Sequence, residues 1–197
     1  MQVVLATANA GKQREFAALL QPLAIELVLQ SALGIGSIEE TGTTFEANAL
    51  LKARHAATVS GLPALADDSG LEVDALGGRP GVYSARYAGP GASDADNNAL
   101  LIRELADVRD AARTARYRCV LALVRSSDEA APLVTHGSWE GRIARQSAGS
   151  GGFGYDPWFI PRGFECTAAQ LPLAEKNALS HRAVALRALV AALRAGQ

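Results

Sequence analysis

The feature that most constrains the fold is an alternation of short apolar runs with segments of helical periodicity. Residues 3–7 (VVLAT) and 25–29 (IELVL) are short runs with β-branched residues, and they predict buried strands. Residues 45–60 predict a helix that ends at Gly61. A further helix is predicted after the first strand by apolar residues at the spacing of one helical face: Phe16, Leu19, Leu20 and Leu23.

The second half of the chain adds helices and a pair of strands. Residues 63–70 predict a short strand that runs into an acidic turn, and residues 94–108 an amphipathic helix. Residues 115–126 and 132–144 predict a long strand and its partner, and residues 178–196 a final helix. Early alternation of strands and helices with a late antiparallel pair predicts an α/β fold with a mixed sheet.

The composition suits one globular domain that spans residues 1–197, with 49% hydrophobic and 20% charged residues. A formal net charge of −1 argues against a broad surface for duplex nucleic acid. No apolar run reaches the ~18 residues of a membrane span, and the N-terminus lacks the basic region of a signal peptide. Cys119 and Cys166 fit neither a zinc pattern nor a disulfide framework, so we expect reduced thiols and a cytoplasmic protein.

Lysine is rare in this chain. Of 19 basic residues, the lysines are Lys12, Lys52 and Lys176. A lysine supplies a compact, mobile charge where arginine supplies a planar fork, so each lysine marks a candidate anion contact. Chance placement on the surface is the alternative.

The segment TANAGK, residues 7–12, joins the first predicted strand to a helix. Free backbone N–H groups at a helix start attract phosphate, and Thr7, Asn9 and Lys12 add polar and charged groups. It is not a P-loop, because the first glycine is missing and Gln13 replaces the Ser/Thr. An ordinary turn with Asn9 as the helix cap is the alternative.

Two acidic segments, ADDSG at 66–70 and EETG at 39–42, offer oxygen ligands. Mg²⁺ is usually held by one or two carboxylates together with substrate phosphates. Solvated turns are the alternative for both segments. Beside a phosphate-type turn, however, two acidic segments suggest an anionic substrate bridged to protein by a metal ion.

The segment GSGGFGYDP, residues 149–157, combines four glycines with Phe153, Tyr155 and Asp156. Glycines allow close backbone approach to a ligand, aromatic rings can stack on a base, and a carboxylate can accept from a ring N–H. A hairpin loop with its aromatic rings in the core is the alternative.

The segment EKNALSHR, residues 175–182, places basic groups near the start of the last predicted helix. Positive charges there oppose the helix dipole, so they favour a nearby anion. A basic helix face without a ligand is the alternative.

Taken together, these segments resemble the non-standard purine NTP pyrophosphatases, also called inosine or xanthosine triphosphate pyrophosphatases. The resemblance extends from residue 3 to about residue 190 and includes ADDSGLEVDALGGRPGVYSARYAG. It implies a homodimeric α/β enzyme with an elongated mixed sheet flanked by helices, in two lobes around a central cleft. It further implies Mg²⁺-dependent hydrolysis of dITP, ITP and XTP to the monophosphate and pyrophosphate, which cleanses the nucleotide pool.

The resemblance also assigns roles to individual residues. Asp68 would be the general base and a metal ligand, Glu40 a second metal ligand, and Ser69 a substrate contact. Lys52 is a further phosphate candidate. The triphosphate would be bound by Thr7, Ala8, Asn9, Ala10, Gly11 and Lys12. The nucleotide would be held by Phe153, Gly154, Tyr155, Asp156, Lys176, His181 and Arg182.

One position departs from the family pattern. A glutamate is expected directly before Asn48, but Ala47 stands there and Glu46 lies one residue earlier. On a helix this shift rotates the carboxylate by ~100°, which leaves a metal or water role for a carboxylate on this helix open.

Base selection follows from the purine edge. Hypoxanthine and xanthine present O6 as an acceptor and N1–H as a donor, and His181 and Arg182 are the candidate donors to O6. Guanine would be excluded through its 2-amino group by the backbone around 153–156. Three alternatives remain: a pyrophosphatase for modified pyrimidine nucleotides, a non-catalytic nucleotide- or RNA-binding module, and a structural dimerisation domain.

Overall fold

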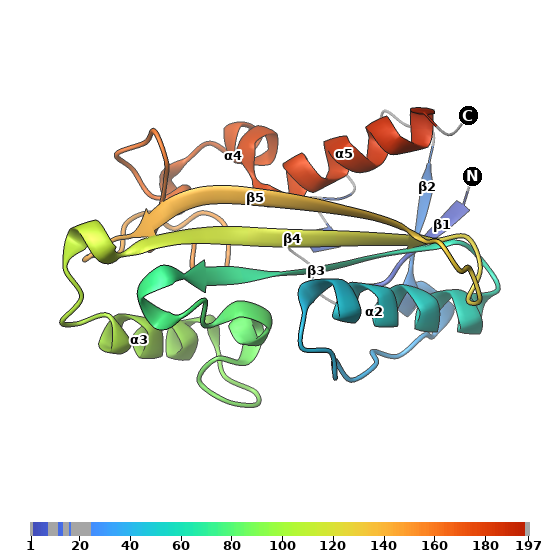
Figure 1. Ribbon diagram of the computed structural model, residues 1–197, viewed down its shortest axis with the longest axis horizontal. Helices are drawn as coiled ribbons and strands as arrows, with labels where there is room; N and C mark the ends of the chain where they lie inside the picture. The colour runs from blue at the N-terminus through green and yellow to red at the C-terminus, as the bar shows by residue number, and fades with distance from the viewer. Residues whose placement is uncertain (1, 8–11, 14–15, 17–24, 196–197) are drawn as a thin grey trace. The chain divides into compact units, whose positions relative to one another are not determined.

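A six-stranded mixed sheet with the strand order β2-β1-β3-β4-β5-β6 organises the computed structural model (Figure 1). The structure describes residues 2–7, 12–13, 16 and 25–195. Strand β1 (Gln2–Leu5) pairs in parallel with β2 (Glu26–Leu29) and with β3 (Ala64–Val73). Strand β5 (Leu133–Ile143) pairs antiparallel with β6 (Phe159–Pro161). The predicted α/β fold with a mixed sheet is therefore confirmed.

The other regular elements of the described part of the chain include helices α2 to α5 and several short 3₁₀ turns. Strand β4 covers Thr114–Val124, between β3 and β5 in the sheet. The helices labelled in Figure 1 are α2 (Phe45–Ser60), α3 (Asp94–Glu104), α4 (Leu173–Leu179) and α5 (His181–Ala195). The 3₁₀ turns are Gln30–Leu33, Asp74–Leu76, Gly81–Arg86, Asp110–Ala112 and Ala168–Gln170.

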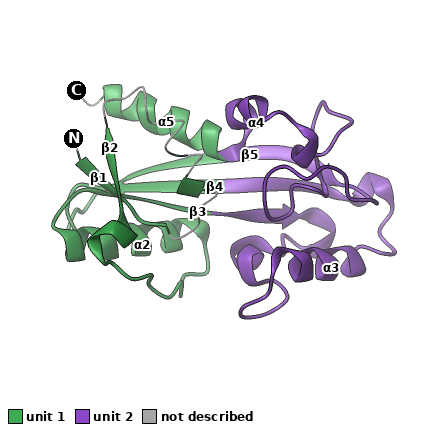
Figure 2. Cartoon of the chain, turned by 180° about the vertical axis from the view of Figure 1, so that it is seen from behind, with its two compact units in different colours: residues 1–68, 119–137, 182–197 green, residues 69–118, 138–181 purple. Residues whose placement is uncertain are grey.

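The chain forms two compact units, coloured in Figure 2. Unit 1 comprises residues 1–68, 119–137 and 182–197, and unit 2 comprises residues 69–118 and 138–181. Strands β3, β4 and β5 each contribute residues to both units. Each unit has its own hydrophobic core.

The core of unit 1 lies between the sheet and helix α5. Leu5, Leu65 and Leu121 of strands β1, β3 and β4 pack against Leu186 and Leu189 of this helix, and all five side chains are buried. In unit 1, helix α2 lies on the other face of the strands (Figure 1). The predicted helix that follows β1 falls mostly on residues outside the described part of the chain.

Helix α2 has the start and stop signals that its sequence predicts. The Thr44 hydroxyl accepts a hydrogen bond from the backbone N–H of Ala47, and Gly61 ends the helix in the left-handed conformation. Phe45, Asn48, Ala49, Ala53, Ala56 and Ala57 form its buried face. Among the described elements, α2 matches its predicted bounds residue for residue.

The core of unit 2 combines strand residues with helix α3. Leu101 of α3 and Leu105, which caps the C-terminus of this helix, pack against Leu71, Tyr117 and Phe159 of the strands. Within the described ranges, no helix is long and apolar enough to cross a membrane.

Two predictions about element bounds were wrong. Strand β3 does not end in an acidic turn: it continues to Val73, so Asp67 and Asp68 lie inside it. The predicted final helix is interrupted, because Ser180 adopts an extended conformation between α4 and α5. In β3, partners distant in the sequence pair with the two carboxylates that local patterning expected to reach solvent.

Candidate active site

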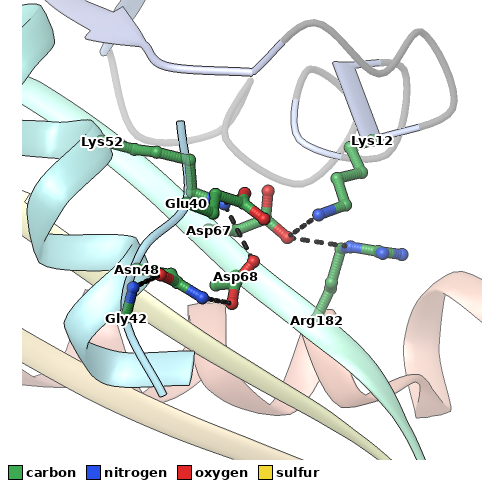
Figure 3. Close-up of polar contacts among 8 residues, drawn as sticks. All are labelled: Lys12, Glu40, Gly42, Asn48, Lys52, Asp67, Asp68 and Arg182. Atoms are coloured by element: carbon green, nitrogen blue, oxygen red, sulfur yellow. Dashed lines mark hydrogen bonds and ion pairs between the residues drawn. The ribbon is translucent and has the colours of Figure 1, made fainter. Parts of the chain in front are cut away.

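Strand β3 carries two adjacent carboxylates into the interior. Asp67 is 1% exposed and Asp68 is 5% exposed. Because successive strand residues point to opposite faces of a sheet, the two carboxylates require different partners. Figure 3 shows both with the charged groups that surround them in unit 1. We call these six residues the ion cluster: Lys12, Glu40, Lys52, Asp67, Asp68 and Arg182.

Asp67 meets two cations that come from opposite ends of the chain. Its Oδ2 lies 2.9 Å from Lys12 Nζ and 3.6 Å from Arg182 Nε, at the start of α5 (Figure 3). Burial raises the pKa of Asp67, but the charges of Lys12 and Arg182 outweigh burial and hold this pKa well below its usual value. The lowered pKa favours the charged form of Asp67, which anchors both cations.

Asp68 is held by helix α2. Its Oδ1 accepts a hydrogen bond of 2.9 Å from Lys52 Nζ, and its Oδ2 accepts one of 3.3 Å from Asn48 Nδ2. Burial raises the pKa of Asp68; the Lys52 charge lowers it, and the nearby Glu40 raises it again. The net shift is upward, in the direction that makes a carboxylate a better proton acceptor.

Lys52 lies between two carboxylates. Its Nζ is 2.6 Å from Glu40 Oε1 and 2.9 Å from Asp68 Oδ1. Burial lowers the pKa of Lys52, but the charges of Asp68, Asp67 and Glu40 outweigh it, so the net shift is upward. The three groups form a chain of charge from the partly exposed Glu40 of the 39–42 loop, through Lys52, to the buried Asp68 of strand β3.

Asn48 ties that loop to the strand, and our sequence reasoning missed it. Its Oδ1 accepts the backbone N–H of Gly42 at 2.8 Å while its Nδ2 faces Asp68 (Figure 3). A Cβ at Gly42 would lie 2.6 Å from Asn48 Oδ1 and 2.8 Å from the Ala47 Cβ, so residue 42 must be glycine for this approach. A polar residue on the buried, alanine-rich face of α2 was the available signal.

The carboxylate before Asn48 does not join the cluster. Glu46 has a half-exposed side chain, and its Oε2 lies 3.6 Å from His136 Nε2. Ala47 is exposed, with its Cβ beside Gly42. The one-residue shift therefore directs Glu46 away from Asp68, as the helical rotation implies.

The donor set around Lys52 fits a hard divalent cation. Glu40 and Asp68 already bring two carboxylates to one positive charge, and such oxygen ligands suit Mg²⁺. Among the residues that the structure describes, no group of three or more His, Cys, Asp or Glu side chains could hold a metal ion. Any further ligands of such a cation would come from water and substrate phosphates.

The phosphate-type turn is described only at its ends. Thr7 follows β1 and is buried, and its carbonyl accepts a hydrogen bond of 3.0 Å from Gln13 Nε2. Ala8, Asn9, Ala10 and Gly11 lie outside the described residues. Lys12 pairs with Asp67.

In unit 2, the glycine-rich loop (residues 149–157) is organised by Asp156. Its Oδ2 lies 2.7 Å from Lys176 Nζ and accepts the Phe153 backbone N–H at 2.9 Å. Gly152 has a φ of +75°, and a Cβ there would collide with the Asp156 carboxylate. The close approach that this glycine permits is thus to the protein's own carboxylate.

The aromatic residues of the loop lie in different environments. Phe153 is half-buried, and Lys176 Nζ lies 5.0 Å from its ring centroid in a cation–π contact. Tyr155 packs into the core of unit 2, and its hydroxyl donates to the Ser84 carbonyl at 2.8 Å. Phe153 is therefore the aromatic ring of the loop that a base could stack on.

Several other predicted residues have defined places. Ser69 follows Asp68 in β3 and is half-buried. The peptide of Gly154 is bound on both sides by α3: its N–H donates to Asp94 Oδ2 at 2.7 Å, and its carbonyl accepts from Asn98 Nδ2 at 3.0 Å. His181, the first residue of α5, stacks on Tyr117, a residue that our sequence reasoning also missed.

The family model described as the Ham1 family matches residues 3–192. The dITP/XTP pyrophosphatase of Shigella flexneri is 57% identical over 195 residues, which cover 99% of both chains. A Ham1 protein from Coxiella burnetii has a similar structure, with a TM-score of 0.92, 47% identity and 98% of each chain covered. The Ham1 protein of Staphylococcus aureus matches with a TM-score of 0.88, 37% identity and full coverage of both chains.

The chain therefore belongs to the Ham1 family. Its fold is the α/β fold of the solved Ham1 structures.

Proposed function

We propose that this protein is a nucleoside triphosphate pyrophosphatase that hydrolyses the non-standard purine nucleotides dITP, ITP and XTP to the monophosphate and pyrophosphate. The observation that carries the proposal is the ion pair between the buried Asp68 and Lys52, which also contacts Glu40. Curated relatives named dITP/XTP pyrophosphatase support dITP and XTP as substrates. A plain binding module would have no use for a desolvated carboxylate with a raised pKa.

Asp68 acts as the general base. Water attacks the α-phosphorus in line; a P–O bond forms to the water oxygen, and the bond to the leaving pyrophosphate breaks. Asp68 accepts the water proton, and its raised pKa favours that transfer. Lys12 and Lys52 supply positive charge where negative charge develops on the leaving group.

Glu40 and Asp68 would hold Mg²⁺. When bound, the ion would neutralise part of the negative charge of the phosphates. In the structure the Lys52 ammonium lies between the carboxylates of Glu40 and Asp68. To contact a substrate phosphate, Lys52 must therefore either keep these two contacts and add a third, or leave at least one of the carboxylates. We assign phosphate contacts to residues 7–12 and a substrate contact to Ser69.

We assign the purine base to the glycine-rich loop, Lys176 and His181 of unit 2 and to Arg182. Phe153 offers a stacking face, and Lys176 and Asp156 fix its loop. His181 and Arg182 are the proposed donors to O6; adenine, which presents an amino group there, would leave them unpaired. In unit 1, Arg182 also pairs with Asp67.

We also propose that the chain is one functional domain over residues 1–197 and works as a homodimer in the cytoplasm. Cys119 and Cys166 are free thiols, which suits a reducing compartment. Gel filtration with light scattering tests the dimer; a monomer at working concentration would contradict it.

A substrate panel tests the function. Pyrophosphate release is measured with ITP, dITP, XTP, GTP, ATP and a modified pyrimidine triphosphate, with Mg²⁺ and with EDTA. We expect turnover of the first three, little of the others and none with EDTA. Comparable rates on GTP would end the base-selection proposal, and preference for the pyrimidine would favour the alternative enzyme.

A further inference from the structure

We propose that Tyr117 is a positioning residue for the purine-base half of the site, acting through Asp156 and His181. This inference rests on the proposed function of the glycine-rich loop. Tyr117 lies in β4, is 7% exposed, and is part of the hydrophobic core of unit 2. A tyrosine in such a core needs a reason for its hydroxyl, because a buried hydroxyl without a partner destabilises the fold.

The hydroxyl has a charged partner. It donates to Asp156 Oδ1 at 3.2 Å, while Asp156 Oδ2 accepts from Lys176 and from the Phe153 N–H. Both oxygens of the Asp156 carboxylate are therefore bound: Oδ2 by Lys176 and the backbone of the loop, and Oδ1 by Tyr117 of the sheet. Without the tyrosine oxygen, Oδ1 loses its bond to the sheet, and the orientation of the Asp156 carboxylate is less restricted.

The ring of Tyr117 has a second contact on the proposed base site. It stacks on the His181 imidazole with centroids 4.8 Å apart and an interplanar angle of 10°. On other sides it meets Phe159 edge to face at 4.7 Å and Trp139 at 6.5 Å. The rigid aromatic core thus restricts the imidazole plane and the Asp156 carboxylate through one side chain.

This placement predicts which kinetic constant depends on Tyr117. Its hydroxyl contacts Asp156, and its ring contacts His181, Phe159 and Trp139, which are base-site and core residues of unit 2. Disturbing it weakens binding of the base equally in the ground state and the transition state. Such a change raises KM and leaves kcat unaltered.

Tyr117→Phe removes one oxygen and retains the ring, so it tests the hydroxyl alone. We expect KM for ITP to rise about tenfold, the scale of a lost hydrogen bond to a charged group, with kcat unchanged within about twofold. The dissociation constant of IMP, measured by calorimetry, should rise by a similar factor. Tyr87→Phe is the matched control, because it also removes a hydroxyl that donates to a carboxylate in unit 2, that of Glu104.

A double-mutant cycle tests the route through Asp156. If Tyr117 acts through this carboxylate, Tyr117→Phe should add little to the IMP dissociation constant of Asp156→Asn. Equal effects in both backgrounds would overturn the proposed route. Unchanged KM and IMP affinity in Tyr117→Phe, whatever its melting temperature, would overturn the whole inference, and so would a fall in kcat alone.

The IMP measurement keeps the two proposals separate. A wild-type protein that binds IMP but releases no pyrophosphate from ITP would contradict the proposed function. The Tyr117→Phe comparison of IMP affinity would still decide the role of Tyr117.

Discussion

Asp67 and Asp68 are neighbours in strand β3, yet the pKa of the first carboxyl group is lowered and that of the second is raised. The alternation of the strand explains the difference: Asp67 meets Lys12 and Arg182, and Asp68 meets Lys52 and Asn48. One carboxylate therefore anchors cations and the other is suited to accept a proton. Environments that separate two pKa values in this way are typical of acid–base sites.

Asp68→Asn should abolish turnover without unfolding the protein. The amide keeps the shape but cannot accept the water proton, so we expect kcat for ITP to fall about 10²- to 10⁴-fold. Because burial disfavours the charged form of Asp68, the melting temperature should stay level or rise. Steady-state kinetics and calorimetric unfolding measure both, with nucleotide binding retained. Unchanged turnover would remove Asp68 from its proposed role.

Asp67→Asn should have the opposite effect on stability. The substitution removes the carboxylate that pairs with Lys12 and with the buried Arg182. We therefore expect the free energy of unfolding to fall by about 3 kcal/mol. Urea unfolding at neutral pH measures this loss. Asp74→Asn, at an exposed carboxylate paired with Arg116, is the comparison and should cost far less. A loss no larger than that of Asp74→Asn would contradict the anchoring role.

The pH dependence of stability should carry the signature of Asp67. The pKa of Asp67 is lower in the folded protein than its unfolded value of 3.8. The stability that charged Asp67 contributes is therefore fully present above pH 3.8, and it is lost as the pH falls towards the pKa of the folded state. The wild type should therefore lose stability on acidification below about pH 4 more steeply than Asp67→Asn. Urea midpoints across that range give the two slopes, and parallel curves would count against the lowered pKa.

Gly42→Ala should lower activity by displacing the loop that carries Glu40. The added methyl group would meet Asn48 Oδ1 at 2.6 Å, so the loop or the amide must move. We expect kcat to fall about tenfold, or more Mg²⁺ to be needed for half-maximal activity, on the scale of one lost hydrogen bond. Gly36→Ala is the matched control, because a Cβ there meets nothing within 4 Å. Equal kinetics for the two variants would mean that the contact has no functional role.

Ala47→Glu tests the departure from the family pattern. Residue 47 is exposed and its Cβ lies beside Gly42, so a glutamate there would add a carboxylate next to the loop that carries Glu40. We expect half-maximal activity at a several-fold lower Mg²⁺ concentration, because a further oxygen ligand strengthens a hard-cation site. Glu46→Ala should leave the Mg²⁺ dependence unaltered, since Glu46 faces His136. A lower Mg²⁺ affinity in Glu46→Ala would show that the shifted carboxylate does serve the metal.

Local patterning predicted most elements well. Helix α2 was predicted at residues 45–60 and occupies Phe45–Ser60, because its cap, its alanine-rich face and its terminal glycine all lie within the helix or beside it. The predicted turn at Asp67 and Asp68 was wrong, because both residues lie inside strand β3. Asp67 is stabilised there by Lys12, which is more than 50 residues away along the chain, and Asp68 by Lys52 of helix α2. Such partners leave no trace in a local window.

The sequence alone determined the alternation of strands and helices, the family and the residue types of the candidate site, because periodicity, capping and ordered motifs are properties of neighbouring residues. Only the tertiary structure decided that Asp67 and Asp68 have different partners, that Asn48 links Gly42 to Asp68, and that Tyr117 contacts both Asp156 and His181. The physical reason is that pKa values and side-chain orientation depend on burial and on charges brought together from distant parts of the chain.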